Sequence, residues 1–162
     1  MDRRQFLKSS SALLTLGAMP NILLATPSEG FDYELIVAPA DVRIAPDGNT
    51  PAWCFNGHFP APVIRAKQHQ PVRIRVVNKL AEPTTIHWHG LRIPIAMDGV
   101  PFLSQAPIMP GETFDYEFTP PDAGTFWYHP HMNSVEQLGK GLVGAFIVDE
   151  AEDPGFDADV VM

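Results

Sequence analysis

Short stretches of alternating apolar and polar residues, separated by turn-forming clusters, most restrict the fold of this chain. Three stretches alternate, at 31–38, 71–80 and 112–120, and 141–150 is a mixed apolar run. Because successive side chains of a strand point to opposite faces, this period of two predicts β-strands. The 17 prolines and 12 glycines agree with many short strands joined by tight turns. With only 133–140 looking helical, the sequence predicts an all-β, Greek-key sandwich or barrel.

Composition narrows the class of partner. Hydrophobic residues make up 45% of the 162 residues, which is enough for a core. The net charge is −8, and no basic block follows the first ten residues, so nucleic acid is excluded as an expected partner. The single cysteine, Cys54, cannot form an internal disulfide, and we predict a buried thiol.

Residues 1–29 have the pattern of an export signal. Arg3, Arg4 and Lys8 precede a weakly apolar stretch that is too short and interrupted to span a membrane. The arginine pair resembles a twin-arginine signal, which predicts a periplasmic or secreted protein. We expect residues 30–150 to form one domain and 151–162 to begin a linker or a next domain. Since DADVVM at 157–162 looks like the opening of a strand, we expect a truncated chain.

Two His-x-His pairs lie in TTIHWHG (84–90) and GTFWYHPH (124–131). On a strand, residues two apart share a face, so each pair can point to one side. Pro130 cannot donate a ladder hydrogen bond, which predicts a strand ending there or an edge strand. Imidazole suits zinc, copper, iron and nickel, so one tetrahedral zinc or a pair of coppers would fit.

The residues around these pairs resemble a known family. The segment from TIHWHG to FIVDE, with WCFNGHFPAPVIRAKQHQPVRIRVVNKL upstream, is similar to the N-terminal cupredoxin domain of multicopper oxidases of the laccase-like type. The similarity covers roughly residues 31–150. Its motifs are specific, because HWHG and HPH occur in order with the Asp-Gly and Pro-Gly-Glu turns between them.

The resemblance implies a role for each histidine. His87 would bind a type 2 copper, and His89, His129 and His131 would bind the two type 3 coppers. These three ions form the cluster at which the family reduces O2 to water. The electrons come from phenols, other aromatics or reduced metal ions, oxidised at a type 1 copper. Asp98 matches a carboxylate implied to deliver protons, and an ordinary Asp-Gly turn would equally explain it.

The resemblance also implies that the site is incomplete. The family's cluster uses eight histidines, and its His-x-x-His-x-His and His-Cys-His motifs do not occur in these 162 residues. The missing ligands and the type 1 copper would come from a C-terminal cupredoxin domain or, as in two-domain laccase-like proteins, a neighbouring subunit. The chain alone is then expected to be inactive. A non-catalytic copper-binding cupredoxin or a mononuclear zinc protein would also account for the two histidine pairs.

The remaining candidates have simpler interpretations. The tryptophans of the two motifs are predicted to pack, the isolated histidines to lie on the surface, and the scattered methionines to fill gaps. These residues are Trp88, Trp127, His58, His69, Met97, Met109 and Met132.

Overall fold

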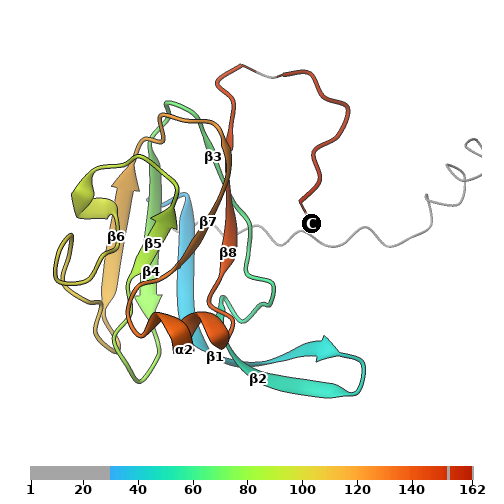
Figure 1. Ribbon diagram of the computed structural model, residues 1–162, viewed down its shortest axis with the longest axis vertical. Helices are drawn as coiled ribbons and strands as arrows, with labels where there is room; N and C mark the ends of the chain where they lie inside the picture. The colour runs from blue at the N-terminus through green and yellow to red at the C-terminus, as the bar shows by residue number, and fades with distance from the viewer. Residues whose placement is uncertain (1–29, 153, 162) are drawn as a thin grey trace, which may run out of the picture.

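In the part of the chain that the structure describes, eight strands form two four-stranded sheets that enclose one main core (Figure 1). The computed structural model describes residues 30–152 and 154–161, so the predicted export signal at 1–29 lies outside the described residues. One sheet has the order β2-β1-β4-β6 and the other the order β3-β8-β7-β5. The elements are β1 (Tyr33–Ala45), β2 (Gly48–Phe55), β3 (Ile64–Lys67), β4 (Val72–Asn78), β5 (Ile86–His89), η2 (Ile95–Met97), β6 (Thr113–Phe118), β7 (Gly124–Pro130), α2 (Ser134–Gly139) and β8 (Gly144–Asp149). The predicted all-β sandwich is confirmed.

Each sheet combines antiparallel and parallel pairs. In the first, β1 pairs with β4 in parallel, and the β1–β2 and β4–β6 pairs are antiparallel. In the second, β3 pairs with β8 in parallel, and β8–β7 and β7–β5 are antiparallel. The chain thus crosses repeatedly from one sheet to the other, as the Greek-key prediction requires. β5 lies at the edge of its sheet.

Trp88 occupies the centre of the core. Its side chain is fully buried and its ring contacts four aromatic rings from both sheets, at centroid distances of 5.2 to 6.0 Å. These rings belong to Tyr116, Phe118, Tyr128 and Phe146. The packing prediction for Trp88 is confirmed. Because Trp88 points inward, its neighbours His87 and His89 must point to the outer face of β5.

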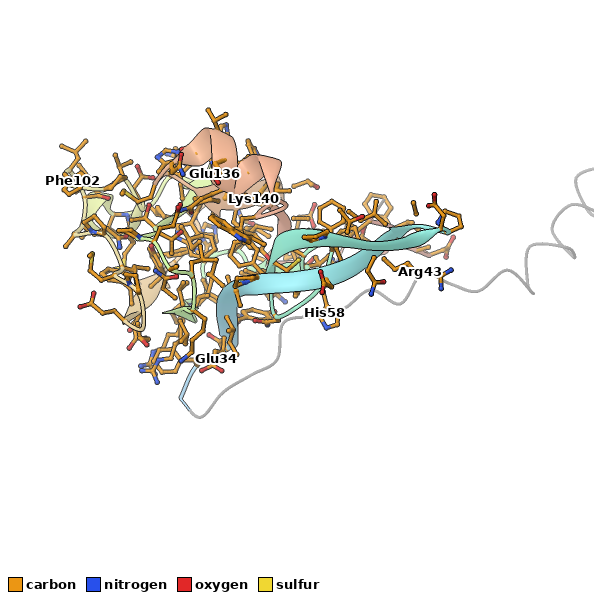
Figure 2. The ribbon with its side chains drawn as sticks, turned by 90° about the horizontal axis from the view of Figure 1, so that it is seen from below. Glu34, Arg43, His58, Phe102, Glu136 and Lys140 are labelled. Atoms are coloured by element: carbon orange, nitrogen blue, oxygen red, sulfur yellow. The ribbon has the colours of Figure 1, made fainter. Side chains whose placement is uncertain are left out.

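Two strands have no clear signal in the sequence. β2 contains Pro51 and begins with exposed residues, so it has no evident period of two, whereas β3 alternates but is only four residues long. Pro51 is tolerated because β2 is an edge strand. β1 and β2 extend past the sandwich as a long arm, with Arg43 near its end (Figure 2). A turn between Ala45 and Gly48, which are paired, closes this arm.

The predicted helix at 133–140 is confirmed as α2, which crosses one end of the sandwich (Figure 1). The strand expected to open at 157–162 is not formed over the described residues 157–161, which have no regular structure. Among the residues described, no helix has the length and apolar character that crossing a membrane requires.

Candidate metal centre

The register between β5 and β7 brings the two histidine pairs together. His87 lies directly opposite His129, and His89 lies opposite Trp127. Side chains of such cross-strand pairs point to the same side of the sheet. β5 ends at His89 and β7 ends at Pro130, which confirms that both pairs lie where strands run into loops. The centre therefore lies on the outer face of an edge strand.

Three of the four histidines converge on one point. A possible ligand nitrogen of His87, of His89 and of His129 lie within 4.8 Å of one another. His131 follows the end of β7, and its ring stacks on that of His87 with centroids 4.3 Å apart. The structure therefore gathers all four predicted histidines in one cluster, with His131 beside the three-residue group rather than within it.

Hydrogen bonds determine which ring nitrogens are free. Nδ1 of His87 donates to the backbone carbonyl of Asp98 at 2.7 Å, and Nδ1 of His129 donates to the carbonyl of Pro130 at 3.1 Å. A ring that donates from Nδ1 has an unprotonated Nε2 when it is neutral. Nε2 of His129 faces Nδ1 of His89 at 3.3 Å, so these two nitrogens already share one locus. The ring nitrogens that could bind a metal are thus already oriented toward a common point.

The environment favours neutral imidazoles. The pKa of His129 is lowered to about 4, mainly by burial and also by the charges of the neighbouring histidines, while its hydrogen bond to the Pro130 carbonyl opposes the shift. Burial also lowers the pKa of His131, again with repulsion from His87. A neutral ring offers a lone pair to a metal, whereas a protonated one cannot.

The loop around Asp98 lies against the backbone of β5. Besides the carbonyl contact, Oδ1 of Asp98 is 3.3 Å from Nδ1 of His87. Gly99 has φ +74°, and a Cβ at this position would be 1.8 Å from the carbonyl oxygen of Ile86. Only glycine permits this approach. Asp98 is therefore both a residue of an Asp-Gly turn and a neighbour of His87.

Trp127 belongs to the cluster rather than to the core. Its ring is stacked on His89 and on His129, with centroids 4.6 and 4.1 Å apart and interplanar angles of 29° and 26°. The predicted packing role is therefore fulfilled against the histidines. The regularity of β7 places Trp127 and His129 on one face, and the aromatic residue two positions before His129 was the available signal in the sequence.

The other candidates lie apart from the cluster. His58 and His69 are exposed, as predicted, and Cys54 is fully buried, where burial raises the pKa of its thiol. Met97 packs against the core, but Met109 is 47% exposed and fills no gap. The gap-filling prediction is therefore wrong for Met109, because the turn that carries it lies on the surface.

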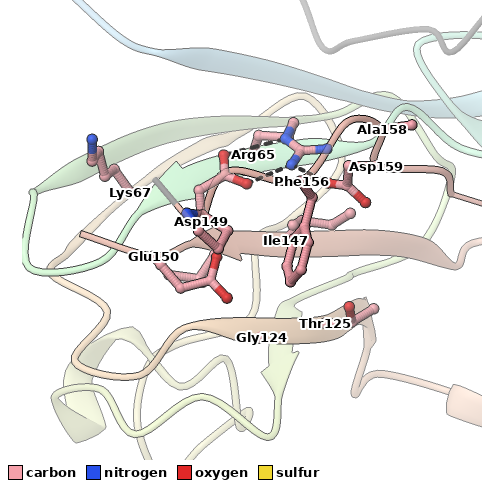
Figure 3. A pocket seen from close by; sticks show the side chains of 12 residues that line it. Arg65, Lys67, Gly124, Thr125, Ile147, Asp149, Glu150, Phe156, Ala158 and Asp159 are labelled. Atoms are coloured by element: carbon pink, nitrogen blue, oxygen red, sulfur yellow. Dashed lines mark hydrogen bonds and ion pairs between the residues drawn. The ribbon is translucent and has the colours of Figure 1, made fainter. Parts of the chain in front are cut away.

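A cavity of about 460 Å³ lies elsewhere on the same sheet (Figure 3). It is formed by β3, β8, the start of β7 and residues 154–159, and its polar wall is the ion pair of Arg65 with Asp149 and Asp159. The sheet order puts this cavity at the edge opposite β5. None of the four clustered histidines lines it.

The donor set of the cluster is chemically suited to a transition metal. Neutral imidazoles are ligands for copper, zinc, iron and nickel, and no thiolate takes part. Two of the rings have their second nitrogen fixed by a backbone carbonyl, which is the usual support for a metal-bound histidine. The residues present therefore fit a copper centre.

Many known proteins are similar to this chain. The family description "Multicopper oxidase" matches residues 37–153. Copper resistance protein A of Escherichia coli is 35% identical over 98% of this chain, which covers 27% of that protein. Laccase-1 of Agaricus bisporus is 38% identical over 91% of this chain, which covers 29% of the laccase.

The structural comparison agrees with the sequences. The crystal structure of a multi-copper oxidase from Pseudomonas thermotolerans superimposes with a TM-score of 0.75 and 55% identity, over 77% of this chain and 31% of that one. The likeness confirms the predicted cupredoxin type of the sandwich. The chain spans between a quarter and a third of the length of these relatives.

Proposed function

The chain belongs to the multicopper oxidase family, and we propose that it supplies half of the histidine ligands of a trinuclear copper cluster in an exported oxidase. The observation that carries the proposal is the convergence of three imidazole nitrogens within 4.8 Å on the outer face of β5 and β7. When bound, copper supplies the one-electron redox chemistry by which O2 is reduced to water.

We assign the histidines by their place in the two pairs. His87 would hold the type 2 copper, and His89, His129 and His131 would hold the type 3 coppers. The fixed Nδ1 atoms of His87 and His129 support Nε2 as the ligand atom of both rings. For His89, the short approach of Nδ1 to Nε2 of His129 supports Nδ1, since the two atoms face the same locus.

Asp98 has two tasks in this proposal. Its backbone carbonyl holds the Nδ1 proton of His87 and so fixes the tautomer and orientation of that ring. Its carboxylate is partly exposed and lies 3.3 Å from the same nitrogen, where it can exchange protons with water and pass them toward the cluster. The Asp98 carboxylate is therefore our candidate for proton delivery.

The cluster needs further ligands. Four imidazoles cannot saturate three metal ions, and the cluster opens outward from an edge strand rather than into the core. We propose that a C-terminal cupredoxin domain, or a neighbouring subunit, closes it and carries the type 1 copper that receives electrons. The reductant is a phenol, another aromatic or a reduced metal ion. The chain alone binds copper but does not turn over.

Export through the twin-arginine route is part of the same proposal. The Arg3-Arg4 pattern at 1–29 supports it, and that route carries proteins already folded. A periplasmic or secreted location follows from it.

A copper titration of the chain tests the proposal. Metal-free chain is titrated with Cu(II) while stoichiometry and the electron paramagnetic resonance spectrum are followed. We expect nitrogen-coordinated Cu(II), lost when His87 or His129 is replaced by alanine. The matched controls are His58→Ala and His69→Ala, since both histidines are exposed and lie outside the cluster.

The same titrations separate the cluster from a surface site and from a zinc centre. Equal loss of binding in the His58 or His69 variants would show that copper binds at surface histidines, and would overturn the proposal. Retention of zinc in preference to copper in a competition titration would favour a zinc protein. Oxygen consumption by the chain alone would contradict the need for a second domain.

A further inference from the structure

His131 is the one member of the cluster that the β-ladder does not hold. The last pair between β5 and β7 joins Ile86 to Pro130, so His131 lies one residue beyond it. The next ordered element is α2, which begins at Ser134. Besides the stacking of its ring on His87, the next part of the chain that can fix His131 is therefore α2 with its contacts.

Gln137 is the residue of α2 that reaches the other histidine segment. Its side chain is fully buried, although it belongs to a six-residue helix at the surface. Its amide Nε2 donates to the carbonyl of Pro83 at 2.9 Å and to Oε1 of Glu82 at 2.6 Å. Its Oε1 accepts from the hydroxyl of Thr84 at 2.8 Å. Both amide hydrogens and the amide oxygen are thus used, on three consecutive residues.

The residues that receive these bonds are themselves fixed. Thr84 exchanges two backbone hydrogen bonds with Ile108, at 3.1 and 2.9 Å, and is fully buried. Glu82 also accepts from Nδ2 of Asn133 at 3.2 Å, which ties the residue before α2 to the same point. A buried amide with every hydrogen bond made has one orientation, because any other would leave a polar group unpaired.

These contacts form a closed path that includes residues of the metal centre. Thr84 lies three residues before His87, the ladder joins His87 to His129, and the chain runs through His131 to Gln137, which returns to Thr84. We propose that Gln137 is a positioning residue for the copper centre, which sets the place of His131 against His87 through Thr84. This inference rests on the proposed copper function.

The hydrogen bonds of the Gln137 side chain go to residues 82–84 and not to a histidine of the cluster, so in this proposal its effect passes through the position of His131. Replacement of supporting residues of metal ligands usually weakens metal binding by about 10- to 100-fold. For Gln137→Met, which keeps the length and removes the amide, we expect Cu(II) affinity to fall by about that factor. Thr84→Val removes one of the three bonds at nearly constant shape and should cause a smaller loss in the same direction.

The experiment is a cycle of four chains: wild type, Gln137→Met, His131→Ala and the double variant. Cu(II) dissociation constants are measured by competition with a chelator, on samples whose folded fraction is determined by circular dichroism. In the His131→Ala background, the effect of Gln137→Met should shrink to about twofold or less, because the ligand through which Gln137 acts is then absent. Val135→Ala, a 92% exposed position of the same helix, is the control and should bind as the wild type does.

The outcomes separate the inference from the function on which it rests. If the wild type binds no copper at the cluster, the proposed function fails. If the wild type binds copper and Gln137→Met binds equally well, or weakens binding by the same factor with and without His131, the inference is overturned. If Gln137→Met does not fold, Thr84→Val takes its place in the same cycle, with the same criterion.

Discussion

Replacement of Gly99 by alanine tests how closely the Asp98 loop is held against the metal strand. An alanine Cβ would lie 1.8 Å from the carbonyl oxygen of Ile86 and 2.8 Å from the amide nitrogen of His87, both backbone atoms that cannot rotate away. To restore an ordinary contact of 3.4 Å, the loop must move by roughly 1.6 Å. The hydrogen bond between His87 and Asp98 is 2.7 Å long, so a shift of that size is enough to break it.

The cost has two parts that a control separates. Alanine at a positive φ costs about 1–2 kcal/mol in any setting. Gly57 has φ +73°, against +74° for Gly99, and nothing lies within 4 Å of its Cβ position. Gly57→Ala should therefore show the conformational cost alone. Gly99→Ala should lose a further ~1–3 kcal/mol from the forced contact.

Urea unfolding of the metal-free chains measures both losses in the free energy of unfolding. We also expect Gly99→Ala to weaken Cu(II) binding by about tenfold or more, since His87 loses its supporting carbonyl, while Gly57→Ala leaves affinity unchanged. Equal unfolding free energies for the two variants would refute the reasoning, because the close approach would then have no energetic consequence.

Three further predictions follow from contacts of the cluster and the core. Cu(II), but not Zn(II), should quench the fluorescence of Trp127, since its ring stacks on two histidines; undiminished quenching in Trp127→Leu would contradict this. Because the pKa of His129 is lowered from 6.5 to about 4, the unfolded chain takes up a proton there before the folded chain does. The metal-free melting temperature should therefore fall as pH drops from about 6.5 toward 4, and His129→Gln should flatten this slope while His58→Gln should not. Tyr116→Phe should cost about 1–3 kcal/mol in urea unfolding, because it leaves the buried N–H of Ile86 without its partner at 3.0 Å; a loss no larger than that of an exposed substitution would show that the bond adds nothing.

The positions of the histidines could be predicted from local pattern, but their distances could not. The period of two placed His87 and His89 on one face, and the structure agrees because β5 and β7 are regular. The opposition of His87 and His129 depends on the register of two strands forty residues apart. No local rule fixes that register, which agrees with the burial of the directly opposed Trp88 and Tyr128 on the inner face of the sheet.

Residues that act through long-range contacts cannot be recognised from local pattern. From the sequence, Gln137 is an ordinary polar residue of a short helix. Its burial and its three bonds to residues 82–84 are visible only in the structure. Gly99 is visible in the sequence as half of an Asp-Gly turn, but the approach to Ile86 is not. β2 is hard to predict for another reason. Its first residues, Pro51 included, are exposed on an edge strand, so the strand lacks the alternation of buried and exposed residues that marks β4.

The order of strands in the second sheet has a consequence for the sequence of events during folding. β8 is the last in sequence of the eight strands that the structure describes, yet it is inserted between β3 and β7, and its contact with β3 joins Arg65 to Asp149 across 84 residues. Contacts this distant in sequence form slowly. β7 therefore has no neighbour on its inner side until the final strand of the domain has left the ribosome. We therefore expect the histidines to become rigid only at that stage, and copper to enter a finished domain rather than to direct its folding.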